Sequence, residues 1–219
     1  MAEGRLTWPQ LFLIADIPSV GAPRIMDVLD EVLPVVPQGR VVVIDRDLPA
    51  DAGGTLVRDR IVRLARLRDL TARHGARLLV TGRCDLAALV GADGVQLPER
   101  ALPARDVRER FPELLVGRSC HDVQGLRVAE ESDADWAFLS PVYAPVSKRV
   151  VAPPLGRDRF AAMVGERTIP VVALGGLDAR RSAAMLEAGA SGVAMLGGVF
   201  LSTEPQHVAK QLVTVLEGI

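Results

Sequence analysis

The chain has 219 residues, 49% of which are hydrophobic, and its formal net charge is −1 at pH 7. A chain of this length buries roughly 70% of its extended-chain surface, so it can build a large core without disulfides or structural metals. The balanced charge implies no basic face and argues against a nucleic-acid partner. No apolar run approaches the roughly 20 residues of a membrane-spanning helix, so we expect no membrane partner.

The two cysteines, Cys84 and Cys120, match no metal-binding or redox spacing. Together with an N-terminus that lacks a signal-peptide pattern, they predict a cytoplasmic protein. The sequence leaves open whether the chain forms a homo-oligomer.

Short apolar runs, typical of buried parallel strands, alternate along the chain with helical patterns. The expected strands are Leu11–Ile17, Arg40–Ile44, Arg77–Val80, Gly94–Leu97, Leu114–Ser119, Trp136–Leu139, Pro170–Gly176 and Gly192–Gly198. The expected helices are Pro23–Leu33, Leu56–His74, Asp85–Val90, Pro103–Phe111, Val123–Glu131, Asp158–Val164, Ala179–Ala188 and Pro205–Leu216, with a short turn at Val199–Leu201.

Eight strand–helix units predict an α/β protein, a single (β/α)8 TIM barrel whose one domain spans residues 1–219. An open doubly wound sheet is disfavoured. Such a sheet carries a glycine fingerprint after its first strand, where this chain reads Asp16-Ile17-Pro18.

The last two strands each end in a pair of glycines, Gly175-Gly176 and Gly197-Gly198. Glycine lets the backbone approach a ligand closely and present its N–H groups. In (β/α)8 barrels the loops after strands 7 and 8 often form a phosphate site. The two pairs therefore predict phosphate binding, and two ordinary tight turns are the alternative.

Alternation along the fifth strand places Ser119 and His121 on one face and Cys120 on the other. A histidine at the catalytic rim can take up or release a proton near neutral pH. We therefore predict acid/base work for His121, with a structural hydrogen-bonding role as the alternative. Cys120 is expected to pack in the core.

Further polar residues follow other strands. Gln96 faces the barrel interior and either holds a substrate's polar edge or is a buried structural amide. Lys148 lies in the long loop Ser140–Gly156 after strand six, and such loops are often lids, so it either contacts a phosphate or is simply solvated. Arg46 likewise either contacts a phosphate or is simply solvated. Thr81 is placed with the substrate-binding residues.

Several blocks also resemble a known family: DLAALVGADGVQLP (Asp85–Pro98), VGRSCH (Val116–His121), SPVYAPVSK (Ser140–Lys148), PVVALGG and GVAMLGG. In their order and spacing they are similar to the thiamin phosphate synthase superfamily, which includes the thiazole tautomerases. The resemblance implies a (β/α)8 barrel, a small phosphorylated thiazole substrate and a role in thiamin biosynthesis.

Three runs depart from the synthases of this superfamily, in which Arg and Lys hold a pyrophosphate and two Asp bind Mg²⁺. The synthase runs are Arg-Asp/Glu-Lys-Asp, Asn-Asp-Arg and Gln-Glu-Asp. This chain has Ile44–Asp47, Thr81–Arg83 and Glu99–Ala101 in their places. Magnesium needs oxygen ligands, which Gly and Ala side chains do not supply. Asp45 and Asp47 remain, so a relocated metal stays open.

The lost ligands favour a thiazole tautomerase-like isomerase that needs no metal or other cofactor. In this hypothesis His121 moves the proton, Gln96 orients the ring, and the four glycine amides hold the phosphate. Ser119, Lys148, Arg46 and Thr81 complete the site. The first alternative is a divergent thiamin phosphate synthase, which joins hydroxymethylpyrimidine diphosphate to the thiazole phosphate and would require Mg²⁺. The second is a non-catalytic thiazole- or thiamin-phosphate-binding regulatory barrel.

Overall fold

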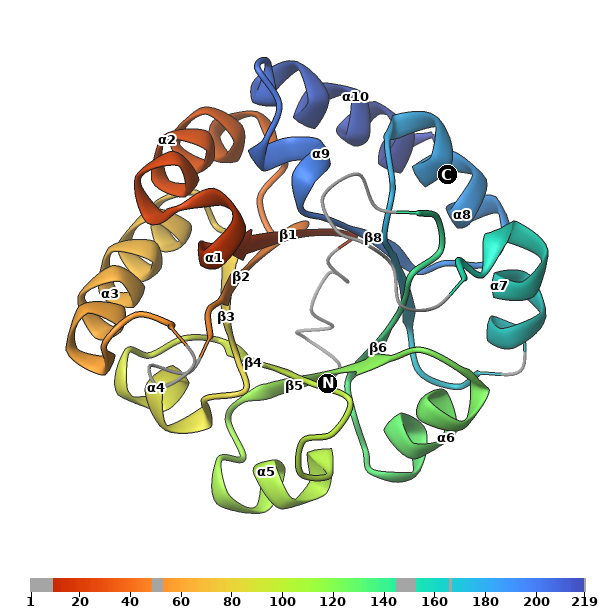
Figure 1. Ribbon diagram of the computed structural model, residues 1–219, viewed down its shortest axis with the longest axis horizontal. Helices are drawn as coiled ribbons and strands as arrows, with labels where there is room; N and C mark the ends of the chain where they lie inside the picture. Colours follow the sequence, from red (N-terminus) through yellow and green to blue (C-terminus); the bar gives the residue numbers. More distant parts are fainter. Residues whose placement is uncertain (1–9, 49–52, 145–152, 166, 219) are drawn as a thin grey trace, which may run out of the picture.

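A computed structural model describes residues 10–48, 53–144, 153–165 and 167–218. Its strands run parallel and close into a barrel in the order β1 to β8, and the helices surround the barrel (Figure 1). The prediction of a (β/α)8 barrel is confirmed. In such a fold all strands end at one rim, so side chains from distant parts of the sequence gather there.

The strands of the barrel are β1 Leu11–Asp16, β2 Val41–Arg46, β3 Arg77–Thr81, β4 Gly94–Leu97, β5 Leu115–Cys120, β6 Trp136–Leu139, β7 Val171–Leu174 and β8 Gly192–Met195. The helices are α1 Ile17–Val20, α2 Ala22–Val32, the 3-10 helix η1 Leu33–Val35, α3 Val57–Arg73, α4 Cys84–Leu89, α5 Ala104–Arg110, α6 Val123–Glu131, α7 Gly156–Val164, α8 Ala179–Glu187, α9 Gly197–Phe200 and α10 Pro205–Glu217.

Two differences from the predicted elements bear on the site. Strand β2 continues two residues past the expected Ile44, because Asp45 and Arg46 keep the parallel register with Ala15 and Asp16 of β1. A short helix, α9, begins at Gly197 where the sequence predicted only a turn from Val199.

The barrel has two hydrophobic layers, which alternate along each strand. The inner layer contains Phe12, Ile14, Val42, Ile44, Leu79, Trp136, Phe138, Val172 and Ala194. The ring of Phe12 packs against two others, with centroids 5.8 Å from Trp136 and 5.2 Å from Phe138. Burying each such large side chain contributes roughly 1.5–3 kcal/mol to the stability of the fold. The outer layer packs the strands against the helices.

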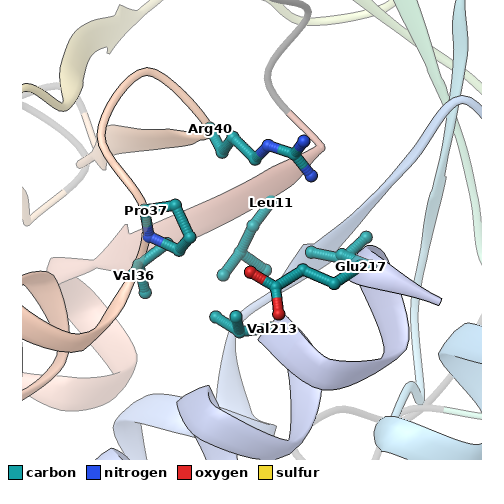
Figure 2. Close-up of a pocket in the computed structure, with 7 residues that line it drawn as sticks. Leu11, Val36, Pro37, Arg40, Val213 and Glu217 are labelled. Carbon is teal, nitrogen blue, oxygen red and sulfur yellow. The ribbon is translucent and has the colours of Figure 1, made fainter.

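A small, largely apolar hollow lies at the opposite end of the barrel from the strand ends. Leu11 at the start of β1, Pro37, Arg40 and residues near the end of α10 line it (Figure 2). Within the described residues, no helix is long and apolar enough to cross a membrane.

Candidate functional site

The first side of the barrel mouth, which we call the glycine side, is formed by the glycine pairs after β7 and β8. Gly175 and Gly176 have φ angles of 110° and 61°, a left-handed conformation that side chains rarely adopt. A Cβ on Gly176 would lie only 2.5 Å from the carbonyl oxygen of Ala144, and one on Gly175 would lie 3.1 Å from Pro141. The turn after β7 therefore requires glycine, because it packs directly on the segment after β6.

Arg181 of α8 links these two segments. Its Nη1 donates a hydrogen bond of 2.7 Å to the carbonyl oxygen of Gly176, and its guanidinium lies 5.0 Å from the ring centroid of Tyr143. The amide of Tyr143 donates to the carbonyl oxygen of Gly175 at 3.1 Å. The sequence analysis missed Arg181, whose only signal is its place just after Asp178, the N-cap of α8.

Gly197 and Gly198 open α9. The first amides of a helix have no partner within that helix, so they can donate to a ligand's oxygen atoms. A Cβ on Gly198 would lie 2.9 Å from Cε of Met195 and 3.1 Å from the carbonyl oxygen of Leu177. Both glycine pairs thus lie at neighbouring strand ends, the arrangement expected of a phosphate site. That role stays a prediction.

Gln96 is joined to its neighbours by a chain of hydrogen bonds inside the barrel. The Nε1 of Trp136 donates to its Oε1 at 3.1 Å, and its Nε2 donates to the Oγ of Ser119 at 3.2 Å. An indole N–H can only donate, so this contact sets the orientation of the amide. Ser119 then accepts from Gln96, which leaves its own hydroxyl proton for another partner. Gly117 makes room, because a Cβ there would lie 2.2 Å from the indole nitrogen.

His121 follows β5 and is exposed. Its Nδ1 lies 2.6 Å from the carbonyl oxygen of Ser140, just after β6, and 3.3 Å from the Oγ of that residue. A carbonyl oxygen only accepts, so Nδ1 carries a proton and Nε2 is the acceptor nitrogen of the neutral ring. The adjacent Cys120 lies in the outer core, as the alternation predicts, and burial raises the pKa of its thiol to about 12.

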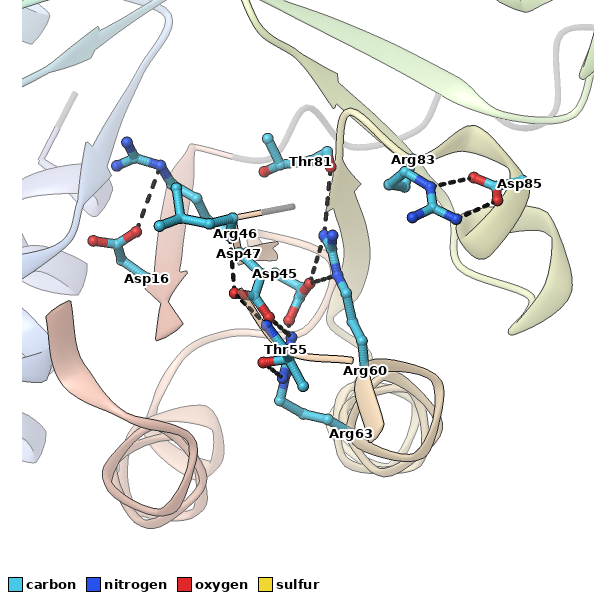
Figure 3. A network of polar contacts seen from close by, with 11 residues as sticks. Asp16, Asp45, Arg46, Asp47, Thr55, Arg60, Arg63, Thr81, Arg83 and Asp85 are labelled. Atoms are coloured by element: carbon cyan, nitrogen blue, oxygen red, sulfur yellow. Dashed lines mark hydrogen bonds and ion pairs between the residues drawn. The ribbon is translucent and has the colours of Figure 1, made fainter. Parts of the chain in front are cut away.

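The adjacent side of the mouth, at the ends of β1 to β3, is called here the arginine–aspartate side and is drawn in Figure 3. Asp45 of β2 is fully buried, and it lies on the strand face that packs against α3. Both of its carboxylate oxygens accept from arginines of that helix, Oδ2 from Nε of Arg60 at 2.9 Å and Oδ1 from Nε of Arg63 at 3.0 Å. Asp45 therefore faces away from the mouth.

Asp47 is held by the same helix. Its Oδ2 accepts from Nη2 of Arg63 at 2.7 Å, and its Oδ1 accepts from the amide of Leu48 at 2.8 Å. Burial alone would raise the pKa of Asp47. Hydrogen bonds from Thr55 and Arg63, together with the Arg63 charge, outweigh that effect and lower the pKa below its ordinary value. Asp47 is thus a carboxylate with its partners inside the protein.

Arg46 reaches the mouth beside Asp16 of β1. Its Nε lies 3.5 Å from Oδ1 of Asp16, whose Oδ2 accepts from the Ser19 hydroxyl. The Arg46 side chain keeps 43% of its surface exposed, so solvent and ligands can reach it. Thr81 ends β3 opposite Gln96, and its carbonyl oxygen accepts from Nη2 of Arg60 at 3.4 Å.

Arg83, in the loop after β3, pairs with its neighbour in sequence. Its Nε and Nη2 donate to the two oxygens of Asp85 at 2.8 and 2.6 Å. The hydrogen bond from Arg83 lowers the pKa of Asp85. This carboxylate, like Asp45 and Asp47, has an arginine partner.

These residues do not fit a magnesium site. In the part of the chain that the structure describes, no three His, Cys, Asp or Glu side chains are grouped so that they could hold a metal ion. Asp45 and Asp47 bind arginines, so a metal relocated to this pair finds no available ligand set. Lys148 and the proposed lid residues around it lie outside the described residues.

Comparison with known proteins shows the family of the chain. The family model described as thiamine monophosphate synthase matches residues 27–199. The chain belongs to the thiamine monophosphate synthase family. A relative from Geobacter sulfurreducens, named provisionally as a thiamine-phosphate synthase, is 36% identical over 94% of this chain and 93% of its own length. The thiamine-phosphate synthase of Mycobacterium tuberculosis is 32% identical over 99% and 98% of the two chains.

A solved structure of the thiamine phosphate pyrophosphorylase from Pyrococcus furiosus has the same fold, with a TM-score of 0.78. The match covers 95% of this chain and 96% of the Pyrococcus furiosus chain, at 23% sequence identity.

The prediction of a thiazole tautomerase-like isomerase is wrong, because these relatives are named synthases, which are transferases. The missing Mg²⁺ ligands favoured the tautomerase over a synthase, on the ground that the transfer reaction depends on the metal. That step fails physically, because a guanidinium is permanently charged and binds phosphate oxygens without a metal. Arg46 places such a group at the same side of the mouth.

Proposed function

We propose that the protein is a transferase of thiamine biosynthesis that joins hydroxymethylpyrimidine diphosphate to a thiazole phosphate. The observation that carries the proposal is similarity over nearly the whole chain to relatives named thiamine-phosphate synthase. The cysteines Cys84 and Cys120 are both free thiols, in keeping with a cytoplasmic location.

The reaction requires one bond exchange. The bond between the pyrimidine methylene carbon and the diphosphate oxygen breaks, and the diphosphate leaves with the electron pair. The thiazole nitrogen then bonds to that carbon, and the ring keeps the positive charge. A protein promotes such a step when it holds both reactants and stabilises the charge on the leaving diphosphate.

The two sides of the mouth suit these two tasks. On the glycine side, Gly175, Gly176, Gly197 and Gly198 offer backbone amides to the thiazole phosphate. On the other side, Arg46 offers a guanidinium to the diphosphate, a group that pairs well with phosphate oxygens. Across the barrel from β1, Ser119, with its hydroxyl proton available, and His121, with Nε2 as an acceptor, lie on and after β5.

The test is an assay of the full chain with both substrates, with thiamine phosphate as the measured product. Product formation is expected for the native sequence. Arg46→Met should lower the rate by about 100-fold, the usual effect of removing one group that stabilises transition-state charge. Arg157→Met, a change at another half-exposed arginine on α7, serves as the matched control and should leave the rate unchanged.

Two results would count against the proposal. The absence of product under all conditions rejects a synthase. Saturable binding of thiazole phosphate or thiamine phosphate without turnover would instead identify the non-catalytic binding barrel.

A further inference from the structure

The arginine–aspartate side of the mouth is balanced in charge. Three carboxylates, those of Asp16, Asp45 and Asp47, lie within ion-pair distance of three guanidinium groups, those of Arg46, Arg60 and Arg63. A site that attracts a divalent cation normally presents surplus negative charge. Here the protein's own cations already neutralise each carboxylate.

Asp45, in β2, and Asp47, just after its end, are also in the wrong position to bind a metal at the mouth. Asp45 faces α3, with no exposed side-chain surface. Asp47 has 1% of its side chain exposed, and its two oxygens accept from Arg63 and from the Leu48 amide. Neither carboxylate has an oxygen directed at solvent.

A magnesium ion would require a costly rearrangement. It takes octahedral oxygen ligands at about 2.0–2.1 Å, so binding Asp47 would bring it close to the guanidinium of Arg63. That guanidinium is 2.7 Å from Asp47 and 9% exposed. The two cations would repel, and displacing Arg63 would leave a buried charge without its partners.

We infer that the arginines of α3 have taken the carboxylates that a metal would need, so that this protein binds its anionic substrate without a divalent cation. Arg60 and Arg63 hold the end of β2 in place. The pairing of β2 with β1 then positions Arg46 at the mouth, on the opposite face of the same strand. The inference rests on the proposed function only for the choice of diphosphate as the anion.

The first experiment titrates Mn²⁺ into the full chain and follows the ion by electron paramagnetic resonance. Mn²⁺ serves as a visible substitute for Mg²⁺. We expect no saturable binding to the native sequence. One equivalent of bound Mn²⁺ that is lost in Asp47→Asn would overturn the inference.

A pair of variants tests the cause. Arg63→Met keeps most of the side-chain stem but uncovers Asp47 and one oxygen of Asp45, so Mn²⁺ affinity should rise at least tenfold above that of the native chain. Arg68→Met, on the same helix, breaks the pair with Asp93, in which Nη1 lies 2.8 Å from Oδ2. This control uncovers one carboxylate away from the mouth and should change nothing. A rise of equal size in both variants would contradict the inference, and if Arg63→Met does not fold, the titration of the native chain decides alone.

The second experiment measures the affinity of the native chain for inorganic diphosphate by calorimetry, in EDTA and in excess Mg²⁺. The two dissociation constants should agree within about twofold. A tenfold or greater dependence on Mg²⁺ would refute metal-independent binding. Neither measurement detects the transfer reaction, so a chain that forms no thiamine phosphate refutes the proposed function and leaves this inference standing.

Discussion

The two sides of the barrel mouth present different chemical groups to a ligand. The glycine side after β7 and β8 consists of backbone, held in left-handed turns and in the first turn of α9. The arginine–aspartate side after β1 and β2 consists of charged side chains, most of them buried and paired. A backbone site depends on shape alone, whereas a side-chain site depends on which charges remain uncompensated.

This difference sets what a substitution does on each side. At Gly176 any side chain would collide with the carbonyl of Ala144, so the residue type is fixed by geometry. At the end of β2, Asp45 and Asp47 are held by arginines one helical turn apart on α3, so a change there alters a charge balance. Substitutions on the two sides should therefore differ in their effects on the free energy of unfolding and on ligand binding.

The largest expected effect is that of Asp45→Asn. The variant leaves Arg60 and Arg63 buried without a full counter-charge, and breaking a buried ion pair on one side costs about 3–5 kcal/mol. Urea denaturation measures this loss in the free energy of unfolding. Asp85→Asn is the control, since its pair with Arg83 is exposed and should contribute at most about 1 kcal/mol. Equal losses in the two variants would show that the buried ion pairs of Asp45 stabilise the fold no more than the exposed pair of Asp85.

Gly176→Ala comes next. A left-handed Ala costs about 1–2 kcal/mol, and the contact with Ala144 should bring the total to about 2–4 kcal/mol. Because the turn must move, affinity for inorganic phosphate should also fall, as calorimetry can measure. Gly91→Ala is a matched control, with φ 63° and no atom within 4 Å of the added Cβ. It should show only the backbone cost and bind phosphate normally.

The smallest effect concerns the pH dependence of Asp47. Its pKa is lowered in the folded state, so its charge stabilises the fold above the unfolded pKa, and this contribution is lost as pH falls through the folded pKa. Asp47→Asn should therefore cost about 1.5–3 kcal/mol at pH 7, as the loss of hydrogen bonds to a charged group typically does. The difference from the native chain should shrink below about pH 4, which acid unfolding curves can follow. Asp158→Asn, at a side chain that is 98% exposed, should give curves that match the native chain at every pH.

Much of the fold follows from the local sequence. Helix Val123–Glu131 and strand Trp136–Leu139 occur with the predicted bounds, because an N-cap aspartate and a compact apolar run mark them. The end of β2 was misplaced. Asp45 and Arg46 look like loop residues by polarity, yet pairing with β1 keeps them in the sheet.

The site was predictable only in part. The positions of Gln96, Ser119 and the glycine pairs at strand ends follow from topology. Their partners do not, since Trp136 is 40 residues from Gln96 and the carbonyl oxygen of Gly175 accepts from the amide of Tyr143, after β6. Strand alternation could have shown that Asp45 faces α3, because it shares a face with Val41 and Val43.

The sequence by itself determined the barrel, the family and the glycine side, since each depends on periodicity or on residues next to one another in the chain. The tertiary structure decided the state of the carboxylates. Whether an aspartate binds a metal or an arginine depends on which charges the fold brings within about 3 Å, and that distance is set by the packing of α3 on β2. The sequence shows that Asp45 and Asp47 are present, and the fold shows that Arg60 and Arg63 already hold them.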